Sequence, residues 1–297
     1  MASQPTEVVS LATIDILKIL TRDATEQRKL FEAAQSPGIF HLDFSNYREG
    51  VLDALDEMYA LSDRYFAQSA AEKEKDVRTD QLPSQDRGYK KSENDETLEM
   101  ADDELLRGGF IQLPTSIADK TELIKRFNEV CHIASLSLLG SLFHSLAQEV
   151  HPSYDPDIVL SHHSHAFTSD TGLKLIYEPT VARAADVFEN KHTDSGTFTL
   201  LFYTEWGLHV FLQSTQRWAY AAPKPGCALV NVADSLQRLS NGIFHSPLHR
   251  VTQHEDGERK RYYLSYFLRP VHRLKERWAR EDSAAAAAVE REGSIQA

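Results

Sequence analysis

The pattern of apolar positions changes from helical to alternating after Pro152. Before that point, apolar residues recur every three or four positions, which predicts helices over 23–35, 48–75 and 119–149. The second segment can form one long amphipathic helix or two broken ones. The third is apolar on more than one face, which is typical of a buried helix. The polar stretch 76–120 predicts irregular connections, a turn at Gly88-Tyr89 and short strand fragments.

After Pro152 the chain consists of short segments rich in β-branched and aromatic residues, separated by Gly, Pro, Asn or Asp. The expected strands are 173–179, 197–205, 208–214, 217–223, 227–234, 250–255 and 261–270, with two earlier strands over 8–16 and 38–44. So many strands in about a hundred residues predict two packed antiparallel sheets or a jelly roll. With the N-terminal helices packed outside this core, we expect an α+β fold.

The same change of pattern sets the expected domain organisation. We expect a single domain over 1–297, since mixed folds of this length often form one unit. Within it, 8–150 forms a helical and mixed N-terminal region and 165–272 forms the jelly-roll core. Residues 273–297 form a helical tail, loosely attached at the end of the chain.

Composition narrows the kinds of partner. The formal net charge of −12 argues against an extended nucleic-acid surface, which needs clustered Lys and Arg. No stretch approaches the roughly 20 apolar residues of a membrane span, and the N-terminus lacks a signal-peptide pattern. The only two cysteines, Cys131 and Cys227, lie far apart, which favours a reducing compartment over a disulfide framework. We expect a cytoplasmic protein without nucleic-acid or membrane partners, and the oligomeric state stays open.

A candidate metal site begins at His192-Thr193-Asp194. On an extended segment residues i and i+2 share a face, so His192 and Asp194 would point into one cavity. His249, on a later strand, would supply a third ligand. Two histidines and one carboxylate suit non-haem Fe(II) with open positions, whereas structural zinc takes four ligands, often cysteines. A polar surface turn is the alternative for the tripeptide alone.

The last predicted strand carries a candidate anion-binding residue. In RYYLSYFL, Arg261, Tyr263, Ser265 and Phe267 share one face. The other face, Tyr262, Leu264, Tyr266 and Leu268, is a core-facing stripe. An Arg fork can pair both oxygens of a carboxylate, and a buried guanidinium requires an anion. We therefore expect an acidic ligand at Arg261.

These residues resemble a known family. The runs HTDSGTFTLL, GLHVF, AAPKPGCALVNVAD, SNGIFHSPLHRV and RYYLSYFLRP, which span 192–270, look like the C-terminal half of the isopenicillin N synthase-like iron(II)- and 2-oxoglutarate-dependent dioxygenases. SLATIDI, GIFHLDF and the turn at Gly88-Tyr89 resemble the N-terminal half more loosely.

The resemblance implies what each of the predicted site residues binds. His192, Asp194 and His249 become the Fe(II) ligands, and Arg261 the partner of the distal carboxylate of 2-oxoglutarate. Tyr263 stands where the family has a serine that bonds the same carboxylate. In Ile176-Tyr177-Glu178-Pro179, Glu178 stands where the family has a tyrosine that often contacts the cosubstrate.

The resemblance also implies a reaction. With Fe(II), 2-oxoglutarate and O₂, such an enzyme oxidises a small organic, specialised metabolite by hydroxylation, desaturation, or ring formation or rearrangement. Two alternatives stay open. One is an iron oxidase of the same fold that needs no 2-oxoglutarate and binds substrate through Arg261. The departures from the family pattern at Tyr263 and Glu178 favour this alternative. The other is a non-catalytic ligand-binding protein. The intact set of three metal ligands argues against it.

Several residues are candidates for the pocket wall. Phe267 can stack on substrate or belong to the core, Lys174 can reach a substrate acid or phenol or lie solvated at the surface, and Phe244 can form part of the rim. A second metal site at His162, His163 and His165 is not expected, because adjacent histidines cannot all converge. We interpret them as a polar loop, and His132 and His144 as packed or surface residues.

Overall fold

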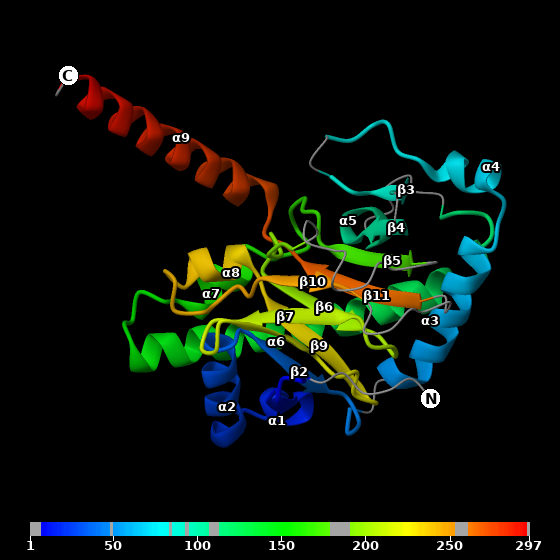
Figure 1. Ribbon diagram of the computed structural model, residues 1–297, viewed down its shortest axis with the longest axis horizontal. Coiled ribbons are helices and arrows are strands. Elements are labelled where there is room, and N and C mark those ends of the chain that lie inside the picture. The colour runs from blue at the N-terminus through cyan, green and yellow to red at the C-terminus, as the bar shows by residue number, and fades with distance from the viewer. Residues whose placement is uncertain are drawn as a thin grey trace.

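Two facing sheets with helices outside the larger one make up the protein in this computed structural model (Figure 1). The structure describes residues 7–47, 50–82, 85–92, 95–106, 113–178, 191–252 and 261–295, with side chains up to residue 285. The fold is that of a jelly roll with added helices, so the predicted α+β class is confirmed.

The larger sheet has the strand order β1-β2-β9-β6-β11-β5-β4-β3, and all its neighbours are antiparallel except the parallel pair of β1 and β2. Its strands are β1 (Thr13–Asp15), β2 (Ile39–Asp43), β3 (Gly88–Lys91), β4 (Glu96–Ala101), β5 (Gly172–Glu178), β6 (Phe198–Phe202), β9 (Cys227–Val232) and β11 (Arg261–Leu268). The smaller sheet, in the order β10-β7-β8, consists of β7 (Leu208–Leu212), β8 (Arg217–Tyr220) and β10 (His249–Val251).

The helices lie around the sheets and at their ends. They are α1 (Ile16–Leu20), α2 (Ala24–Gln35), α3 (Val51–Phe66), α4 (Ala70–Lys73), α5 (Asp102–Leu106), α6 (Thr121–Glu149), α7 (Pro156–Ser161), α8 (Asp234–Leu239) and α9 (His272–Ile295), with 3-10 turns at Glu74–Asp76 and Ala118–Lys120. By length and composition α6 resembles a membrane span, but 67% of its most apolar window is buried inside the protein, as expected of a core helix. α9 extends away from the body of the molecule (Figure 1).

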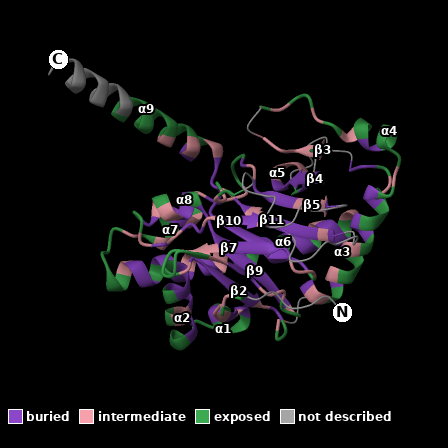
Figure 2. Ribbon diagram, viewed as in Figure 1, coloured by how far each residue is buried: buried purple, intermediate pink, exposed green. Residues whose placement is uncertain are grey.

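Apolar residues form one core on each side of the larger sheet, and Figure 2 shows burial concentrated in the strands. On the helix side, Leu264 and Tyr266 of β11 pack in one cluster with Phe127 of α6. Between the sheets, Tyr263 packs in a second cluster with Leu201 and Val210. The predicted alternation of β11 is therefore confirmed, and the Arg261 face points into the space between the sheets.

The N-terminal half differs from the prediction mainly at its opening strand. Of the strand expected over 8–16, Thr13–Asp15 forms β1, and Val8 forms an isolated bridge with Tyr220. The strand ends at Asp15 because its carboxylate accepts a hydrogen bond from the Leu17 N–H at 2.9 Å and begins α1. The segment 48–75 forms two helices, which is one of the two predicted alternatives. The short strand fragments expected in the polar stretch are β3 and β4, which extend the larger sheet beyond the C-terminal strands. Residues 253–255 of the expected strand 250–255 lie outside the described residues.

Candidate iron and cosubstrate site

The three predicted metal ligands come together at one edge of the smaller sheet. His192 and His249 form an antiparallel bridge, and each backbone N–H donates to the other's carbonyl at 2.9 Å. Asp194 follows on the same segment, and one donor atom from each side chain lies within 4.8 Å of the other two. The Asp194 Oδ1 atom is 3.8 Å from His192 Nε2 and 3.7 Å from His249 Nε2.

One of the three side chains is exposed to solvent and the other two are largely buried. The His192 side chain is 54% exposed, whereas those of Asp194 and His249 are 11% and 5% exposed. One ion held by the three groups would therefore meet protein on one side and keep positions open on the other. Two imidazoles and a carboxylate in this arrangement fit a facial Fe(II) site.

Neighbouring groups orient the two buried ligands. Asp194 Oδ2 accepts hydrogen bonds from Thr199 Oγ1 at 2.7 Å and Asn231 Nδ2 at 3.2 Å, which leaves Oδ1 facing the imidazoles. His249 Nδ1 donates to the Pro247 carbonyl at 3.1 Å, which leaves Nε2 free to bind a metal. Thr199 and Asn231 were not predicted from the sequence. Their signal was a polar residue inside an otherwise apolar strand.

Protonation also suits metal binding. Burial alone would raise the pKa of Asp194, but the nearby His249 and the hydrogen bonds from Thr199 and Asn231 outweigh it and lower the pKa. Burial lowers the pKa of His249, although Asp194 opposes this shift. At neutral pH the site therefore offers a carboxylate and a neutral imidazole.

A second group of polar side chains lies at the start of β11. Arg261 and Tyr263 are 8% and 3% exposed, and Arg261 Nε, Arg261 Nη1 and Tyr263 Oη have no hydrogen-bond partner among the described residues. Glu178 of β5 lies directly opposite Arg261 in the ladder. A Cβ on Gly207 would lie 2.5 Å from Tyr263 Oη and 3.6 Å from Arg261 Nη1, so this glycine leaves space beside both groups.

Comparison with known proteins places the chain in a family. Residues 149–270 match the model of the 2OG-Fe(II) oxygenase superfamily. The chain is 32% identical over 278 residues to the 2-oxoglutarate-dependent dioxygenase frbH of Dothideomycetidae sp. (strain 11243), an alignment that covers 87% of this chain and 81% of that protein. The chain belongs to the 2OG-Fe(II) oxygenase superfamily. The isopenicillin N synthase-like subtype stays a resemblance.

Further relatives agree with this membership. The chain is 28% identical to the 2-oxoglutarate-dependent dioxygenase gloE of Glarea lozoyensis, over 89% of this chain and 80% of that protein. Its fold is similar to a full-length Neurospora crassa protein in complex with α-ketoglutarate and 5-formyluracil, with a TM-score of 0.73, 22% identity, and coverage of 91% and 89%. The rice dioxygenase for auxin oxidation follows with a TM-score of 0.65, 22% identity, and coverage of 87% and 83%.

As a 2OG-Fe(II) oxygenase, the protein is an oxidoreductase that uses Fe(II), 2-oxoglutarate and O₂ on a small-molecule substrate. The unpartnered guanidinium atoms of Arg261 fit the distal carboxylate of 2-oxoglutarate. Strand β7 joins the two ends of the site, because Val210 pairs with His249 and Gly207 lies beside Arg261. The stretch from Gly207 to Val210 spans about 10 Å, at roughly 3.3 Å per residue, which suits a small diacid.

Replacing Thr199 by Val is expected to weaken Fe(II) binding roughly 10–100-fold, since groups that orient a metal ligand typically contribute that much. The hydroxyl is lost from Asp194 Oδ2 while the shape of the side chain is kept. Thr197→Val is the matched control, because its hydroxyl contacts His163 instead. Titration with Fe(II) or Co(II) measures both variants, and equal weakening in the two would contradict the role of Thr199.

The predicted wall residues have different surroundings. Lys174 is not the solvated surface residue of the alternative interpretation, because its side chain is 13% exposed and its Nζ pairs with Asp86 at 3.0 Å and Glu99 at 3.2 Å. Phe267 is half-buried, and the centroid of its ring lies 5.9 Å from Lys174 Nζ. The rim position predicted for Phe244 is wrong, because this residue is fully buried in the helix-side core.

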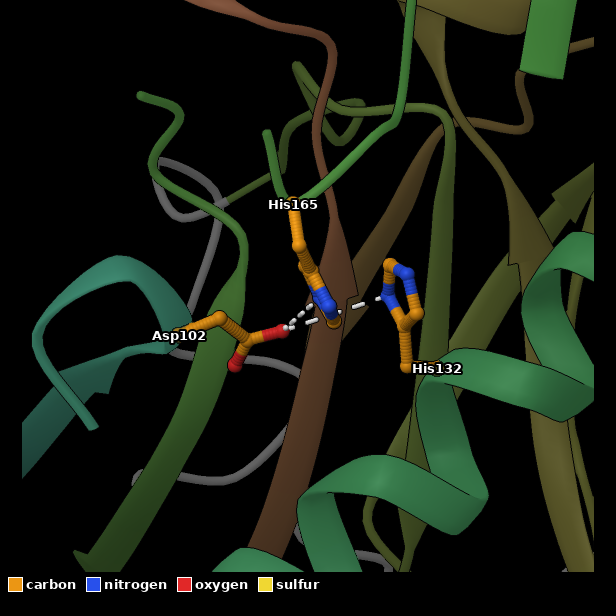
Figure 3. A group of neighbouring side chains, drawn as sticks. All are labelled: Asp102, His132 and His165. Atoms are coloured by element: carbon orange, nitrogen blue, oxygen red, sulfur yellow. Dashed lines mark hydrogen bonds and ion pairs between the residues drawn. The ribbon is translucent and has the colours of Figure 1, made fainter. Parts of the chain in front are cut away.

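The histidines outside the site pack as expected, with one addition. His163 Nδ1 donates to the Val159 carbonyl at 2.8 Å, and His162, His163 and His165 do not form one site. His165 instead meets Asp102 and His132, as Figure 3 shows. This convergence was not predicted, because the three residues come from α5, α6 and the loop after α7.

The Asp102 cluster is explained by hydrogen bonds. His165 Nε2 lies 3.1 Å from Asp102 Oδ2, the Tyr266 hydroxyl donates to the same oxygen at 3.2 Å, and Asn128 donates to the other. The rings of His132 and His165 stack at 3.7 Å with an interplanar angle of 23°. Stacked rings cannot both direct a nitrogen lone pair at one ion. We therefore interpret this cluster as a buried network that joins the helices to the sheet.

Proposed function

We propose that His192, Asp194 and His249 hold Fe(II), and that Arg261 and Tyr263 bind the distal carboxylate of 2-oxoglutarate. The observation that carries this proposal is the pairing of two incomplete sites along one strand. One is a three-ligand cluster with an open side, and the other is a buried guanidinium whose Nε and Nη1 atoms have no hydrogen-bond partner among the described residues. A diacid that chelates the metal and reaches Arg261 would complete both.

The bound metal and cosubstrate would supply the oxidising chemistry with O₂, with 2-oxoglutarate decarboxylated to succinate. The residues of this chain supply position. Thr199 and Asn231 fix the Asp194 carboxylate, and Arg261 sets the far end of the cosubstrate. Apolar side chains between the sheets, among them Leu208 and Val210, exclude water from the region between the two ends.

The proposed substrate is a small organic, specialised metabolite, oxidised by hydroxylation, desaturation, or ring formation or rearrangement. Among the relatives, the Neurospora crassa protein binds 5-formyluracil, and the rice protein is a dioxygenase for auxin oxidation, so small organic molecules are the class to screen. We assign Phe267 and Lys174 to the substrate end. Phe267 is the cross-strand neighbour of Thr199, which bonds Asp194. Because Lys174 is already paired with two carboxylates, a neutral polar substrate suits this wall better than an acid.

We further propose one domain over 1–297, with the iron and cosubstrate site in the 165–272 core, and a cytoplasmic location without nucleic-acid or membrane partners. The net charge of −12 supports the absence of a nucleic-acid surface. Cys131 and Cys227 are both buried free thiols, which suits a reducing compartment.

The test is release of succinate from 2-oxoglutarate by the Fe(II)-loaded protein against a panel of small metabolites. We expect succinate to form only with both Fe(II) and 2-oxoglutarate present, and to increase with a true substrate. O₂ consumption with substrate and iron alone would instead show an oxidase that needs no cosubstrate. A protein that binds neither Fe(II) nor Co(II) would overturn the proposal in favour of a non-catalytic ligand-binding role.

Replacing Gly207 by Ala is expected to raise the KM for 2-oxoglutarate at least about tenfold, because the new Cβ would lie 2.5 Å from Tyr263 Oη and displace the hydroxyl. Adding Tyr263→Phe removes that oxygen and leaves the ring carbon at 3.5 Å, an ordinary contact. The double variant should therefore recover part of the affinity that Gly207→Ala alone loses. Steady-state kinetics over a range of 2-oxoglutarate concentrations measures this, and a double variant weaker than both singles would contradict the assigned positions.

A further inference from the structure

The cosubstrate end of the site contains an acid as well as a base. Glu178 is 8% exposed, and its Oε2 has no hydrogen-bond partner among the described residues. It stands directly opposite Arg261 across the ladder between β5 and β11, and its side chain shares the face of the sheet that Arg261 and Tyr263 occupy. These groups of both signs lie close enough together to shift the pKa of Glu178 and of Tyr263, yet Glu178 Oε2, Arg261 Nη1 and Tyr263 Oη form no hydrogen bond of normal geometry with the described residues. Such an arrangement indicates a ligand that accepts a hydrogen bond from one group and shares a proton with the other.

The charges of these groups affect how a dicarboxylate can bind beside them. With Glu178 ionised, Arg261 and Glu178 together are neutral before any ligand binds. The distal carboxylate of 2-oxoglutarate would bring a second negative charge beside a single guanidinium, in a site shielded from water. Two carboxylates in one such site do not both stay ionised, because each raises the pKa of the other. Binding and the protonation of Glu178 are therefore linked.

Glu178 can change its charge near neutral pH. Burial raises the pKa of Glu178 to about 7, although the Tyr263 hydroxyl and the Arg261 guanidinium oppose the shift. Tyr263 stays protonated, because burial and then the charge of Glu178 raise its pKa well above the usual range. From the start of β4, Asp95 also raises the pKa of Glu178, and Glu96 lies on the opposite face of the sheet.

We propose that Glu178 takes up one proton from solvent when 2-oxoglutarate binds, and that the resulting carboxylic acid donates a hydrogen bond to the distal carboxylate beside Arg261. The proposal rests on the assignment of Arg261 under the proposed function. No bond of the cosubstrate forms or breaks in this step, and the only exchange is the proton from water. Glu178 thus becomes a binding residue that makes the affinity for the cosubstrate depend on pH.

The test measures 2-oxoglutarate binding by isothermal titration calorimetry, with Zn(II) in place of iron so that no turnover occurs. At pH 8.5, in buffers of different ionisation enthalpy, the unaltered protein is expected to take up close to one proton per cosubstrate bound. Its Kd should rise as pH increases from about 7, approaching tenfold per pH unit, because the ionised Glu178 must first be protonated. Below that pH the Kd should change little through this group.

Glu178→Gln provides the decisive comparison, since the amide mimics the protonated acid in shape and donates a hydrogen bond. We expect it to bind without proton uptake and, at pH 8.5, roughly tenfold or more tightly than the unaltered protein. Asp95→Asn is the matched control, because it removes a carboxylate that also acts on Glu178 but already accepts a hydrogen bond from Ser92, and it should keep the proton uptake. Equal proton uptake in Glu178→Gln and the unaltered protein would overturn the proposal.

Arg261→Ala separates this proposal from the one on which it rests. If Arg261→Ala leaves the Kd for 2-oxoglutarate unchanged, the assignment of Arg261 is wrong, and the role of Glu178 is overturned with it. If Arg261→Ala weakens 2-oxoglutarate binding but the Glu178→Gln protein still takes up a proton when 2-oxoglutarate binds, only the role of Glu178 is overturned. Weaker binding in the first variant and loss of proton uptake in the second support both.

Discussion

Replacing Asp194 by Ala is expected to lower kcat by more than about 100-fold, because loss of a residue that only supports a metal ligand already costs roughly 10–100-fold. Asp194 is the proposed anionic ligand, and its Oδ1 is the atom that faces both histidine Nε2 atoms. The fold should survive, since the two hydrogen bonds that the carboxylate accepts are worth about 1–3 kcal/mol each at most. Succinate release and thermal unfolding together measure the effect.

Asp234→Ala is the matched control for this variant. Asp234 accepts a hydrogen bond from Thr193 at 3.0 Å, so it supports the same segment without belonging to the ligand set. We expect it to retain Fe(II) binding and most of the activity. Activity in Asp194→Ala as high as in Asp234→Ala would show that the metal lies elsewhere. His192→Ala and His249→Ala are expected to behave like Asp194→Ala.

Replacing Arg261 by Ala is expected to raise the KM for 2-oxoglutarate at least about 30-fold. Truncating one partner of a buried, hydrogen-bonded charge pair costs about 2–5 kcal/mol, and about 1.4 kcal/mol corresponds to each factor of ten. Arg261 is 8% exposed, and two of its nitrogen atoms have no hydrogen-bond partner among the described residues, so these atoms are available to the ligand. Fe(II) affinity should change little, because the metal ligands are separate residues.

Arg261→Lys separates the contribution of the positive charge to cosubstrate binding from the contribution of the guanidinium geometry. Lysine keeps the positive charge but loses the fork that pairs two carboxylate oxygens, so we expect an intermediate KM. Steady-state kinetics with 2-oxoglutarate as the varied ligand compares the three proteins. A KM that is unchanged in Arg261→Ala would show that the cosubstrate carboxylate binds another group.

Local periodicity made much of the site predictable. Side chains alternate along a strand, so the sequence alone placed His192 with Asp194 and Arg261 with Tyr263, and the structure has both pairs on the expected faces. The core stripe of β11 followed from the same rule. Capping by Asp15, however, is a local signal that was not predicted, because the apolar run over 8–16 suggested a strand through that residue.

Contacts between distant segments were beyond the reach of periodicity. Strand register decides that Glu178 faces Arg261, and that Thr199 and Asn231 reach Asp194, and the register depends on the packing of the whole sheet. The same limit explains Phe244, whose place near a turn suggested the rim although it packs on Phe31 in the core.

Anaerobic titration of the Fe(II)-loaded protein with 2-oxoglutarate, followed by the absorption of the iron complex, tests whether the metal and the cosubstrate bind at the proposed residues. We expect a saturable absorption band with one cosubstrate per chain, which disappears in Asp194→Ala and needs at least about 30-fold more 2-oxoglutarate in Arg261→Ala. A band of unchanged strength and affinity in both variants would contradict the proposed iron and cosubstrate site.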